Sequence, residues 1–275
     1  GVFTLRTLGD AVSLHAAISA AERVTVVGAG FIGLEVAASA RMVGKDVTVL
    51  EVAPVPLAHA IGPEVGGALA EVHRQQGVDL RCGVGVDAIE GGDRVERVRL
   101  TDGSVVEADV VVVGIGVAPA TGWLEGSGLT IDNGVVCDET CLAAPGVVAA
   151  GDVCRWPNPL FGETMRVEHW DNAVQQGMAA GKRLLAGDGP GEAFAPVPYF
   201  WSDQYDLKVQ FVGRGGERVD VVEGEVGSER YAVSYSRDGV LVGALAVKTP
   251  RTLMKLRMAI ADRTPVDDAL AALAS

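Results

Sequence analysis

The chain has 275 residues, 48% of them hydrophobic, and a net charge of −13 at pH 7. This acidic balance argues against broad nucleic-acid binding, because a negative surface repels phosphate backbones. No apolar run reaches the ~18 residues that a membrane span needs. The N-terminus GVFTLRTLGD lacks the basic start and apolar core of a signal peptide. We therefore predict a cytoplasmic protein of about two domains, with no nucleic-acid or membrane partner.

The cysteines and histidines indicate no metal site. None of the four cysteines belongs to a C-x-x-C pair, and the four histidines are scattered without metal-ligand spacing. Cys137 and Cys141 are separated by three residues, which favours two unpaired thiols over a redox or metal-binding pair. We expect no bound metal and a reducing compartment.

Residues 8–20 predict a helix that leads into a nucleotide-binding unit. The stretch VTVVGAGFIGLEVA, residues 24–37, begins as a buried β-branched strand and passes through a glycine turn into a helix. A second buried strand, DVTVLE, closes on Glu51, 18 residues after Gly33. Strand, G-x-G-x-x-G turn, helix, strand and terminal acid together predict a dinucleotide site.

Each position of the turn Gly28-Ala29-Gly30-Phe31-Ile32-Gly33 has an expected task. Gly28 permits the tight turn, Gly30 lets backbone N–H groups approach a pyrophosphate, and Gly33 lets helix and strand pack closely. Phe31 and Ile32 open the helix, whose N-terminus attracts phosphate. The alternative is a glycine-rich turn of an ordinary α/β unit.

Glu51 indicates which dinucleotide is bound. Its carboxylate would accept hydrogen bonds from the adenosine ribose hydroxyls, whereas a 2′-phosphate would meet a negative charge. Residues 52–56, VAPVP, supply no cation to offset that charge. NAD(H) is therefore favoured over NADP(H).

A helix is predicted at 63–76, followed by antiparallel strands that turn at Asp102-Gly103. The buried strand DVVVVGIG, residues 109–116, ends in Gly114 and Gly116. A second glycine turn beside the first would let another stretch of backbone approach the dinucleotide. A plain strand-to-loop turn is the alternative.

After Pro119 the pattern changes to short strands, with a hairpin turn at Asn133-Gly134. The other predicted elements are a helix at about 172–186, a Gly- and Pro-rich linker at 187–198, an antiparallel sheet over 199–247 and a helix at 250–262.

Three further stretches carry a family resemblance: GVVAAGDV at 146–153, RVEHWDNAVQQG at 166–177 and PYFWSDQYDLKVQFVG at 198–213. In this order, after the glycine unit, they resemble the FAD-dependent NADH:ferredoxin reductases of oxygenase systems. Rubredoxin reductases and apoptosis-inducing factor share this plan, which belongs to the pyridine nucleotide-disulfide oxidoreductase-like flavoproteins. The resemblance covers essentially the whole chain.

The resemblance implies an α/β fold with three parts. Residues 1–118 would form a Rossmann-like NAD-binding domain, and residues 119–196 the C-terminal part of an FAD-binding domain with a linker. Residues 197–275 would form a small α+β C-terminal domain. Such flavoproteins begin with another strand–G-x-G-x-x-G–helix unit that holds the FAD adenosine. That unit should precede residue 1, so we expect the sequence to be a piece of a longer protein.

The resemblance also assigns residues to FAD. Gly151 and Asp152 would approach the ribityl chain, to which Asp152 hydrogen-bonds. Glu168, His169 and Trp170 would pass the pyrimidine end of the flavin, and Phe200 and Trp201 would cover the isoalloxazine. Taken alone, Asp152 is better explained by a capped turn. Core packing is the alternative for Trp170 and Trp201, and we favour a structural role for His169.

Toward NADH the resemblance assigns Glu35, near the nicotinamide, and the strand with Gly114 and Gly116. No catalytic acid or base is expected, because hydride passes directly from nicotinamide to flavin and the protein supplies orientation. Two positions depart from the family pattern: Val55 stands where an Arg is usual in E-x-x-P-R, and Pro119-Ala120 replaces the end of G-x-x-P-N. Either change is expected to weaken contacts to NADH.

The implied function is electron transfer from NADH through FAD to a ferredoxin-type iron–sulfur protein. Two alternatives stay open: an NADH-responsive binding protein like apoptosis-inducing factor, and an NAD-binding module without flavin activity. Residues 248–263 hold five basic side chains against one acid, and we predict that they attract an acidic ferredoxin. A solvated helix face is the alternative there, and the oligomeric state stays open.

Overall fold

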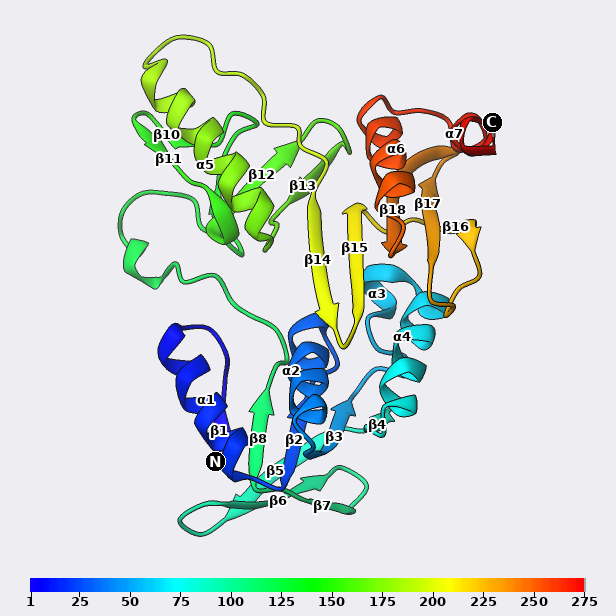
Figure 1. Cartoon of the computed structure of the whole chain (residues 1–275). Helices are drawn as coiled ribbons and strands as arrows, with labels where there is room; N and C mark the ends of the chain where they lie inside the picture. The colour runs from blue at the N-terminus through cyan, green and yellow to red at the C-terminus, as the bar shows by residue number, and fades with distance from the viewer. Residues whose placement is uncertain (275) are drawn as a thin grey trace. The chain divides into compact units, whose positions relative to one another are not determined.

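The computed structural model describes residues 1–274. The N-terminal part is built on a five-stranded sheet in the order β1-β8-β2-β3-β4, in which every neighbouring pair is parallel. Figure 1 shows β8, β2 and β3 side by side. The strands are β1 (Val2–Phe3), β2 (Arg23–Val27), β3 (Asp46–Glu51), β4 (Asp79–Cys82) and β8 (Val110–Val113).

Four helices alternate with these strands, namely α1 (Leu8–Ala20), α2 (Phe31–Met42), α3 (Ala58–Ile61) and α4 (Pro63–Gln75). The start of α1 is set by Thr7 and Asp10, each of which accepts a hydrogen bond from the other's backbone N–H. Small residues of α2, Ala37 and Ala40, are buried with Val26 and Val49 in one core. Their size lets the helix lie close to the sheet.

Three further strands, β5 (Val86–Gly91), β6 (Val95–Leu100) and β7 (Val105–Glu107), form an antiparallel sheet between β4 and β8 in the sequence. Asp102 accepts hydrogen bonds from Ser104, and Gly103 has a φ of 86° in the predicted turn. The helices at 8–20 and 63–76 and these antiparallel strands are therefore confirmed.

The amino ends of β2 and β8 are joined by an ion pair. Asp109 lies 2.6 Å from the Arg23 guanidinium and also accepts from the backbone N–H groups of Arg23 and Glu22. These donors, led by the Arg23 side chain, lower the pKa of Asp109 to about 2.

The ion pair predicts an acid-dependent part of the stability. The pKa of Asp109 is about 2 when folded and 3.8 at its ordinary value, so its contribution is complete above the ordinary value and is lost as pH falls through 2. After a discount for exposure to solvent, we expect about 1 kcal/mol. Urea unfolding between pH 5 and pH 2 should show this loss in the wild type and not in Asp109→Asn. Parallel losses in both proteins would contradict the assignment.

The second part holds short strands, as predicted: β9 (Val135–Val136), β10 (Leu142–Ala144), β11 (Val147–Val148), β12 (Cys154–Asn158) and β13 (Glu163–Met165). They form a β13-β12-β9 sheet and a β10-β11 pair, with single 3-10 turns η1 (Gly122–Leu124) and η2 (Gly151–Val153). Ile131 bridges Val135 across the predicted Asn133-Gly134 turn. Trp156, fully buried on β12, is at the centre of the core.

Helix α5 (Trp170–Leu185) begins two residues earlier than the predicted 172. Its N-cap is His169, so the EHW segment runs into the first turn of the helix instead of standing before it. The sequence offered no Ser, Thr, Asp or Asn at the true N-cap, which is the residue type that marks such a start.

The third part is a five-stranded antiparallel sheet in the order β14-β15-β18-β17-β16, followed by two helices. The strands are β14 (Tyr199–Gln204), β15 (Leu207–Gly213), β16 (Arg218–Gly224), β17 (Tyr231–Arg237) and β18 (Val240–Val247). The predicted helix at 250–262 is α6 (Pro250–Ala261), and a further helix, α7 (Val266–Ala274), was not predicted. Two acids in its first turn, Asp267 and Asp268, were the available signal.

Residues 187–198 form neither helix nor strand, as expected of a linker, yet they are fastened to the second part. Trp156 donates to the Phe194 carbonyl and Asn158 to the Pro196 carbonyl, both at 3.0 Å. The Phe194 N–H donates to the backbone carbonyl of Glu139. Residues 187–198, called the strap below, therefore form a loop that is hydrogen-bonded to the second part.

The predicted fold class, α/β with a parallel sheet and a small α+β C-terminal part, is confirmed. The chain divides into two compact units. Unit 1 comprises residues 1–116, 202–209 and 224–231, and unit 2 comprises 117–201, 210–223 and 232–275. The division into domains at 118 and 196 stays a prediction. Among the described residues, no helix combines the length and the apolarity needed to cross a membrane.

Candidate functional site

The glycine turn in unit 1 is packed so tightly that side chains are excluded at two positions. Gly28 has a φ of 100°, and a Cβ placed on it would lie 2.4 Å from the carbonyl oxygen of Gly114. A Cβ on Gly33 would lie 2.1 Å from the carbonyl oxygen of Gly28. Gly28, Gly33 and Gly114 therefore bring the end of β8, the turn and α2 into backbone contact. The sequence predicted the close packing at Gly33, whereas for Gly114 it predicted an approach to the dinucleotide and not this contact with Gly28.

Gly30 differs from these glycines because it faces open space. It is the N-cap of α2, no side chain caps the helix there, and a Cβ on it would meet nothing within 4 Å. Gly116, with a φ of 111°, is open in the same way. The first turn of a helix carries N–H groups without intrahelical acceptors. An uncapped helix N-terminus, with free space beside Gly30, fits the pyrophosphate of a dinucleotide.

Glu51, at the carboxyl end of β3, has a second task that the sequence did not reveal. Its carboxylate accepts hydrogen bonds from the backbone N–H groups of Ala29 at 2.7 Å and Ala53 at 2.8 Å. It therefore helps to hold the glycine turn in shape. Each carboxylate oxygen can accept a second hydrogen bond, so the predicted contact to ribose hydroxyls fits this arrangement.

A cation near Glu51 comes from α4 and not from residues 52–56. The Arg74 side chain hydrogen-bonds the thiol of Cys82, and Cys82 is the register partner of Glu51 between β3 and β4. The sequence did not indicate this proximity, since Arg74 is 23 positions away from Glu51.

Glu35, on the second turn of α2, is half-buried and receives two hydrogen bonds. The Ser202 hydroxyl donates to its Oε1 at 2.6 Å, and the backbone N–H of Asp203 also donates to its carboxylate. Burial raises the pKa of Glu35, and the two donors act in the opposite direction. The family resemblance assigns Phe200 and Trp201 of the same segment to FAD and gives no role to Ser202.

In unit 2, Gly151 and Asp152 form η2 and are held mainly through their backbone. The Gly151 N–H donates to Gln176 of α5 at 2.9 Å, and the Asp152 carbonyl accepts from Arg166 at 3.0 Å. Arg166 also forms an ion pair of 2.5 Å with Glu168. Gln176 and Arg166 therefore position the predicted flavin residues, although the sequence did not single them out.

His169 is neutral at pH 7, because burial lowers its pKa to about 4. The Arg214 charge adds to this effect, while the charges of Asp152 and Asp171 oppose it. Its ring packs against Phe200 with centroids 4.8 Å apart, which supports the favoured structural role. Its Nδ1, however, is buried without a hydrogen-bond partner within the described part of the chain.

The aromatic residues divide into a packed and an exposed set. Phe200 stacks on Phe211 at 5.3 Å, on the packed side of β14. Trp170 and Trp201 are 71% and 40% exposed and meet edge to face at 6.2 Å. The alternative that these tryptophans are core residues is therefore wrong, and they offer an aromatic surface.

The buried polar atoms of this region fit a polar ligand. Besides His169 Nδ1, Arg166 Nε and Asn172 Oδ1 are buried with no hydrogen-bond partner in residues 1–274. An unpaired buried polar atom is costly, so such atoms usually meet a ligand or water. Three of them within seven residues, beside Gly151 and two exposed tryptophans, fit the polar edge of a flavin.

Two protein-family models match the chain. The model described as pyridine nucleotide-disulphide oxidoreductase matches residues 1–177, and the model described as reductase C-terminal matches residues 199–274.

Relatives that are similar to this chain are named as reductases. The ferredoxin reductase subunit of 5,5′-dehydrodivanillate O-demethylase from Sphingobium sp. (strain NBRC 103272 / SYK-6) is 40% identical over 272 residues. Putidaredoxin reductase CamA from Pseudomonas putida is 34% identical over 269 residues. These alignments cover 97% and 96% of this chain, but only 65% and 63% of the relatives' own lengths.

Solved structures are similar over nearly the whole chain. In the covalent putidaredoxin reductase–putidaredoxin complex, the matching chain has a TM-score of 0.90 and 31% identity. That match covers 100% of this chain and 69% of the other. The ferredoxin reductase of the CYP199A2 system from Rhodopseudomonas palustris has a TM-score of 0.89 and 33% identity, with 99% and 70% covered. The chain therefore belongs to the pyridine nucleotide-disulphide oxidoreductase family and carries a reductase C-terminal domain.

Proposed function

We propose that this chain belongs to a flavoprotein oxidoreductase that passes electrons from NADH through FAD to a ferredoxin-type iron–sulfur protein. The observation that carries the proposal is the open glycine turn closed by Glu51, in a chain that also has the reductase C-terminal domain. The relatives' names support the same activity, since both are reductases that act with ferredoxin-type proteins.

The residues of unit 1 would bind NADH in a defined order. Gly30 and the start of α2 would receive the pyrophosphate, and Glu51 the adenosine ribose. Gly114 and Gly116 would let the end of β8 approach the dinucleotide, and Glu35 would lie near the nicotinamide. Orientation is their contribution, because hydride transfer needs no protein acid or base.

The charge of Glu51 predicts a preference between the two nicotinamide cofactors. We expect NADH to bind at least about tenfold more tightly than NADPH, because the 2′-phosphate would face the carboxylate. Fluorescence titration of both nucleotides measures the ratio. Arg74→Ala should widen the preference if its guanidinium softens the repulsion. Equal dissociation constants for NADH and NADPH in the wild type would contradict this role of Glu51.

The residues of unit 2 would hold FAD. Asp152 would approach the ribityl chain, with its backbone fixed by Arg166, while Glu168, His169 and Trp170 would border the pyrimidine end. Trp201 would cover the isoalloxazine. When bound, FAD accepts a hydride from NADH and releases the electrons singly, which a one-electron acceptor requires.

The partner would dock on α6, whose exposed face is basic. Arg251 and Lys255 are exposed there, at helical spacing from the exposed methionines Met254 and Met258. A local positive surface on a chain of net charge −13 would steer an acidic ferredoxin and would lose effect as salt rises.

Charge reversal on this face tests the partner. Arg251→Glu with Lys255→Glu should raise the KM for ferredoxin by about tenfold at low salt, and reduction of the flavin by NADH should be unchanged. The matched control is Arg94→Glu with Lys182→Glu, which makes the same change of charge at exposed residues outside α6. Equal KM values for the two double variants would show that α6 is not the docking face. A holoprotein that reduces no one-electron acceptor would overturn the electron-transfer function itself.

A cytoplasmic location is part of this proposal. The four cysteines, Cys82, Cys137, Cys141 and Cys154, are all free, as they are in proteins of reducing compartments.

A further inference from the structure

Five polar side chains of unit 1 form one continuous hydrogen-bonded chain that ends on Glu35. Ser202 Oγ lies 2.6 Å from Glu35 Oε1, and Gln204 Nε2 lies 3.0 Å from Ser202 Oγ. Gln204 Oε1 lies 2.9 Å from His73 Nε2, and the Tyr205 hydroxyl lies 3.1 Å from His73 Nδ1. The chain links α2, the β14–β15 hairpin and α4.

With Glu35 ionised, every hydrogen of this hydrogen-bonded network points toward the Glu35 carboxylate. An ionised carboxylate only accepts, so Ser202 must donate to it, and Gln204 Nε2 can then only donate to the Ser202 oxygen. The Gln204 carbonyl is left facing His73, which must donate from Nε2. His73 Nδ1 then accepts from the Tyr205 hydroxyl, the one donor at the end of the chain.

The opposite orientation is incompatible with an ionised Glu35. If Gln204 turned its amide, its Nε2 would face His73 and its carbonyl would take the Ser202 hydrogen. Glu35 Oε1 and Ser202 Oγ would then lie 2.6 Å apart with no hydrogen between them unless Glu35 were protonated. The tautomer of His73 and the ionisation of Glu35 are therefore linked through Gln204.

The three middle residues of this hydrogen-bonded network are buried from water. His73 is 0% exposed, Ser202 0% and Gln204 1%. Buried polar groups without partners are costly, so the loss of one member leaves its neighbours unsatisfied. Burial also lowers the pKa of His73, which keeps the ring neutral and able to donate and accept at once.

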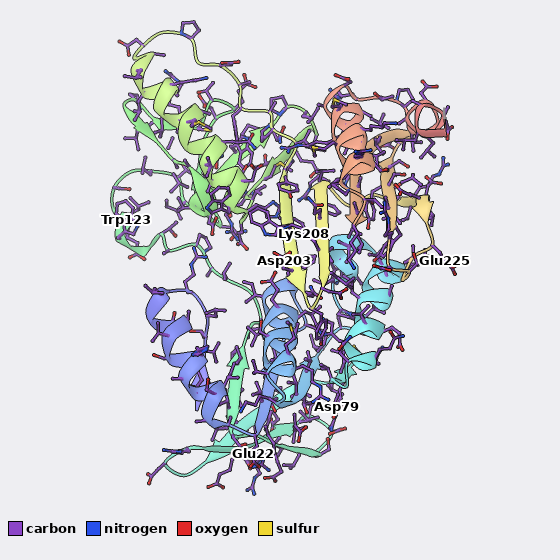
Figure 2. All side chains as sticks on the ribbon, in the orientation of Figure 1. Glu22, Asp79, Trp123, Asp203, Lys208 and Glu225 are labelled. Atoms are coloured by element: carbon purple, nitrogen blue, oxygen red, sulfur yellow. The ribbon has the colours of Figure 1, made fainter. Side chains whose placement is uncertain are left out.

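The turn of the β14–β15 hairpin is strained at the last residue of the hydrogen-bonded network. Tyr205 has a φ of 56°, a conformation in which turns usually carry Gly, Asn or Asp. Asp203 and Lys208, labelled in Figure 2, form an ion pair across this hairpin at 3.5 Å. A strained tyrosine at this tip is explained if its hydroxyl is needed on His73.

We propose that Gln204 and His73 are positioning residues for Glu35: together with Tyr205 they orient the Ser202 hydroxyl, which holds the Glu35 carboxylate in one direction and ionised. The nicotinamide contact of Glu35 rests on the proposed function, but the hydrogen-bonded network does not. Glu35 also receives the Asp203 N–H and feels the Asp203 charge, and neither contact passes through Gln204.

The first test is the tautomer of His73 in the wild-type chain at pH 7. A two-bond ¹H–¹⁵N correlation spectrum should show the hydrogen on Nε2 and none on Nδ1. In Tyr205→Phe, which removes the donor to Nδ1, the spectrum should show a mixture. A wild-type His73 with its hydrogen on Nδ1 would overturn the proposed donor-to-acceptor direction of the hydrogen-bonded network.

The second test follows the Glu35 carboxyl group by ¹³C NMR, assigned with Glu35→Gln. Ser202→Ala should raise the pKa of Glu35 by about one unit, and Gln204→Met, which keeps the volume and removes the amide, by about half as much. The NADH dissociation constant should rise about threefold to tenfold in both variants. The control is Gln75→Met, on the exposed side of α4, which should change neither value.

The outcomes separate the two proposals. If Ser202→Ala shifts the pKa of Glu35 and a folded Gln204→Met does not, Gln204 is only structural and the inference is wrong. If the wild type does not bind NADH, the proposed function fails. The His73 tautomer and the titration of the Glu35 carboxyl group still test the hydrogen-bonded network. Thermal unfolding identifies any variant that fails to fold, and the wild-type tautomer then remains the decisive measurement.

Discussion

Gly30→Ala is expected to leave the fold intact and to weaken NADH binding about tenfold, or about 1.4 kcal/mol, whereas Gly33→Ala is expected to destabilise unit 1 by about 3 kcal/mol. The two substitutions are chemically identical and lie three residues apart. Only their surroundings differ.

The difference follows from what a Cβ would meet. At Gly33 it would lie 2.1 Å from the Gly28 carbonyl oxygen, so the α2 helix must move away from the turn. That cost exceeds the gain of about 1 kcal/mol that Ala has over Gly inside a helix. At Gly30 nothing lies within 4 Å, so the added methyl only occupies the space in front of α2, where the pyrophosphate would bind.

Urea unfolding and NADH titration of both variants measure the two effects separately. Gly30→Ala should unfold within about 0.5 kcal/mol of the wild type, since only the N-cap changes. Normal NADH affinity in Gly30→Ala would show that the nucleotide does not approach the turn there. Normal stability in Gly33→Ala would show that α2 and the turn have room to separate.

Trp156→Ala should cost about 4 kcal/mol of unfolding free energy in unit 2. Trp156 is fully buried among Cys154, Met165 and Val167. Its ring nitrogen also holds the Phe194 carbonyl, so the strap at 187–198 should loosen as well. Hydrogen exchange of the amides at 192–197 should accelerate in this variant, even under conditions in which the rest of unit 2 stays folded.

Trp123→Ala is the matched control, because Trp123 is 80% exposed and lies in η1 (Figure 2). Its removal should change stability by no more than about 0.5 kcal/mol. If both variants unfold alike, Trp156 does not anchor the core of unit 2. If Trp156→Ala is destabilised while exchange at 192–197 stays slow, the strap is held by Asn158 and the Phe194 N–H instead.

The sequence by itself determined the elements that depend on local pattern. The run Val24–Val27, the glycines after it and the acid that closes DVTVLE predicted β2, the turn, α2 and β3 in the right order, because backbone conformation there depends on neighbouring residues. The open face of Gly30 and the tight packing of Gly28 and Gly33 agree with the expected tasks of the three positions. The family followed from motif order.

Only the tertiary structure decided which distant side chains meet. Glu51 holds Ala29, Arg166 holds the Asp152 carbonyl, and Gln204 joins His73 across 131 positions of the chain. The tertiary structure also binds the predicted linker at 187–198 to unit 2 and places Trp170 and Trp201 on the surface. Local sequence carries no signal for such contacts, because a buried amide or imidazole can be satisfied by a partner anywhere in the fold.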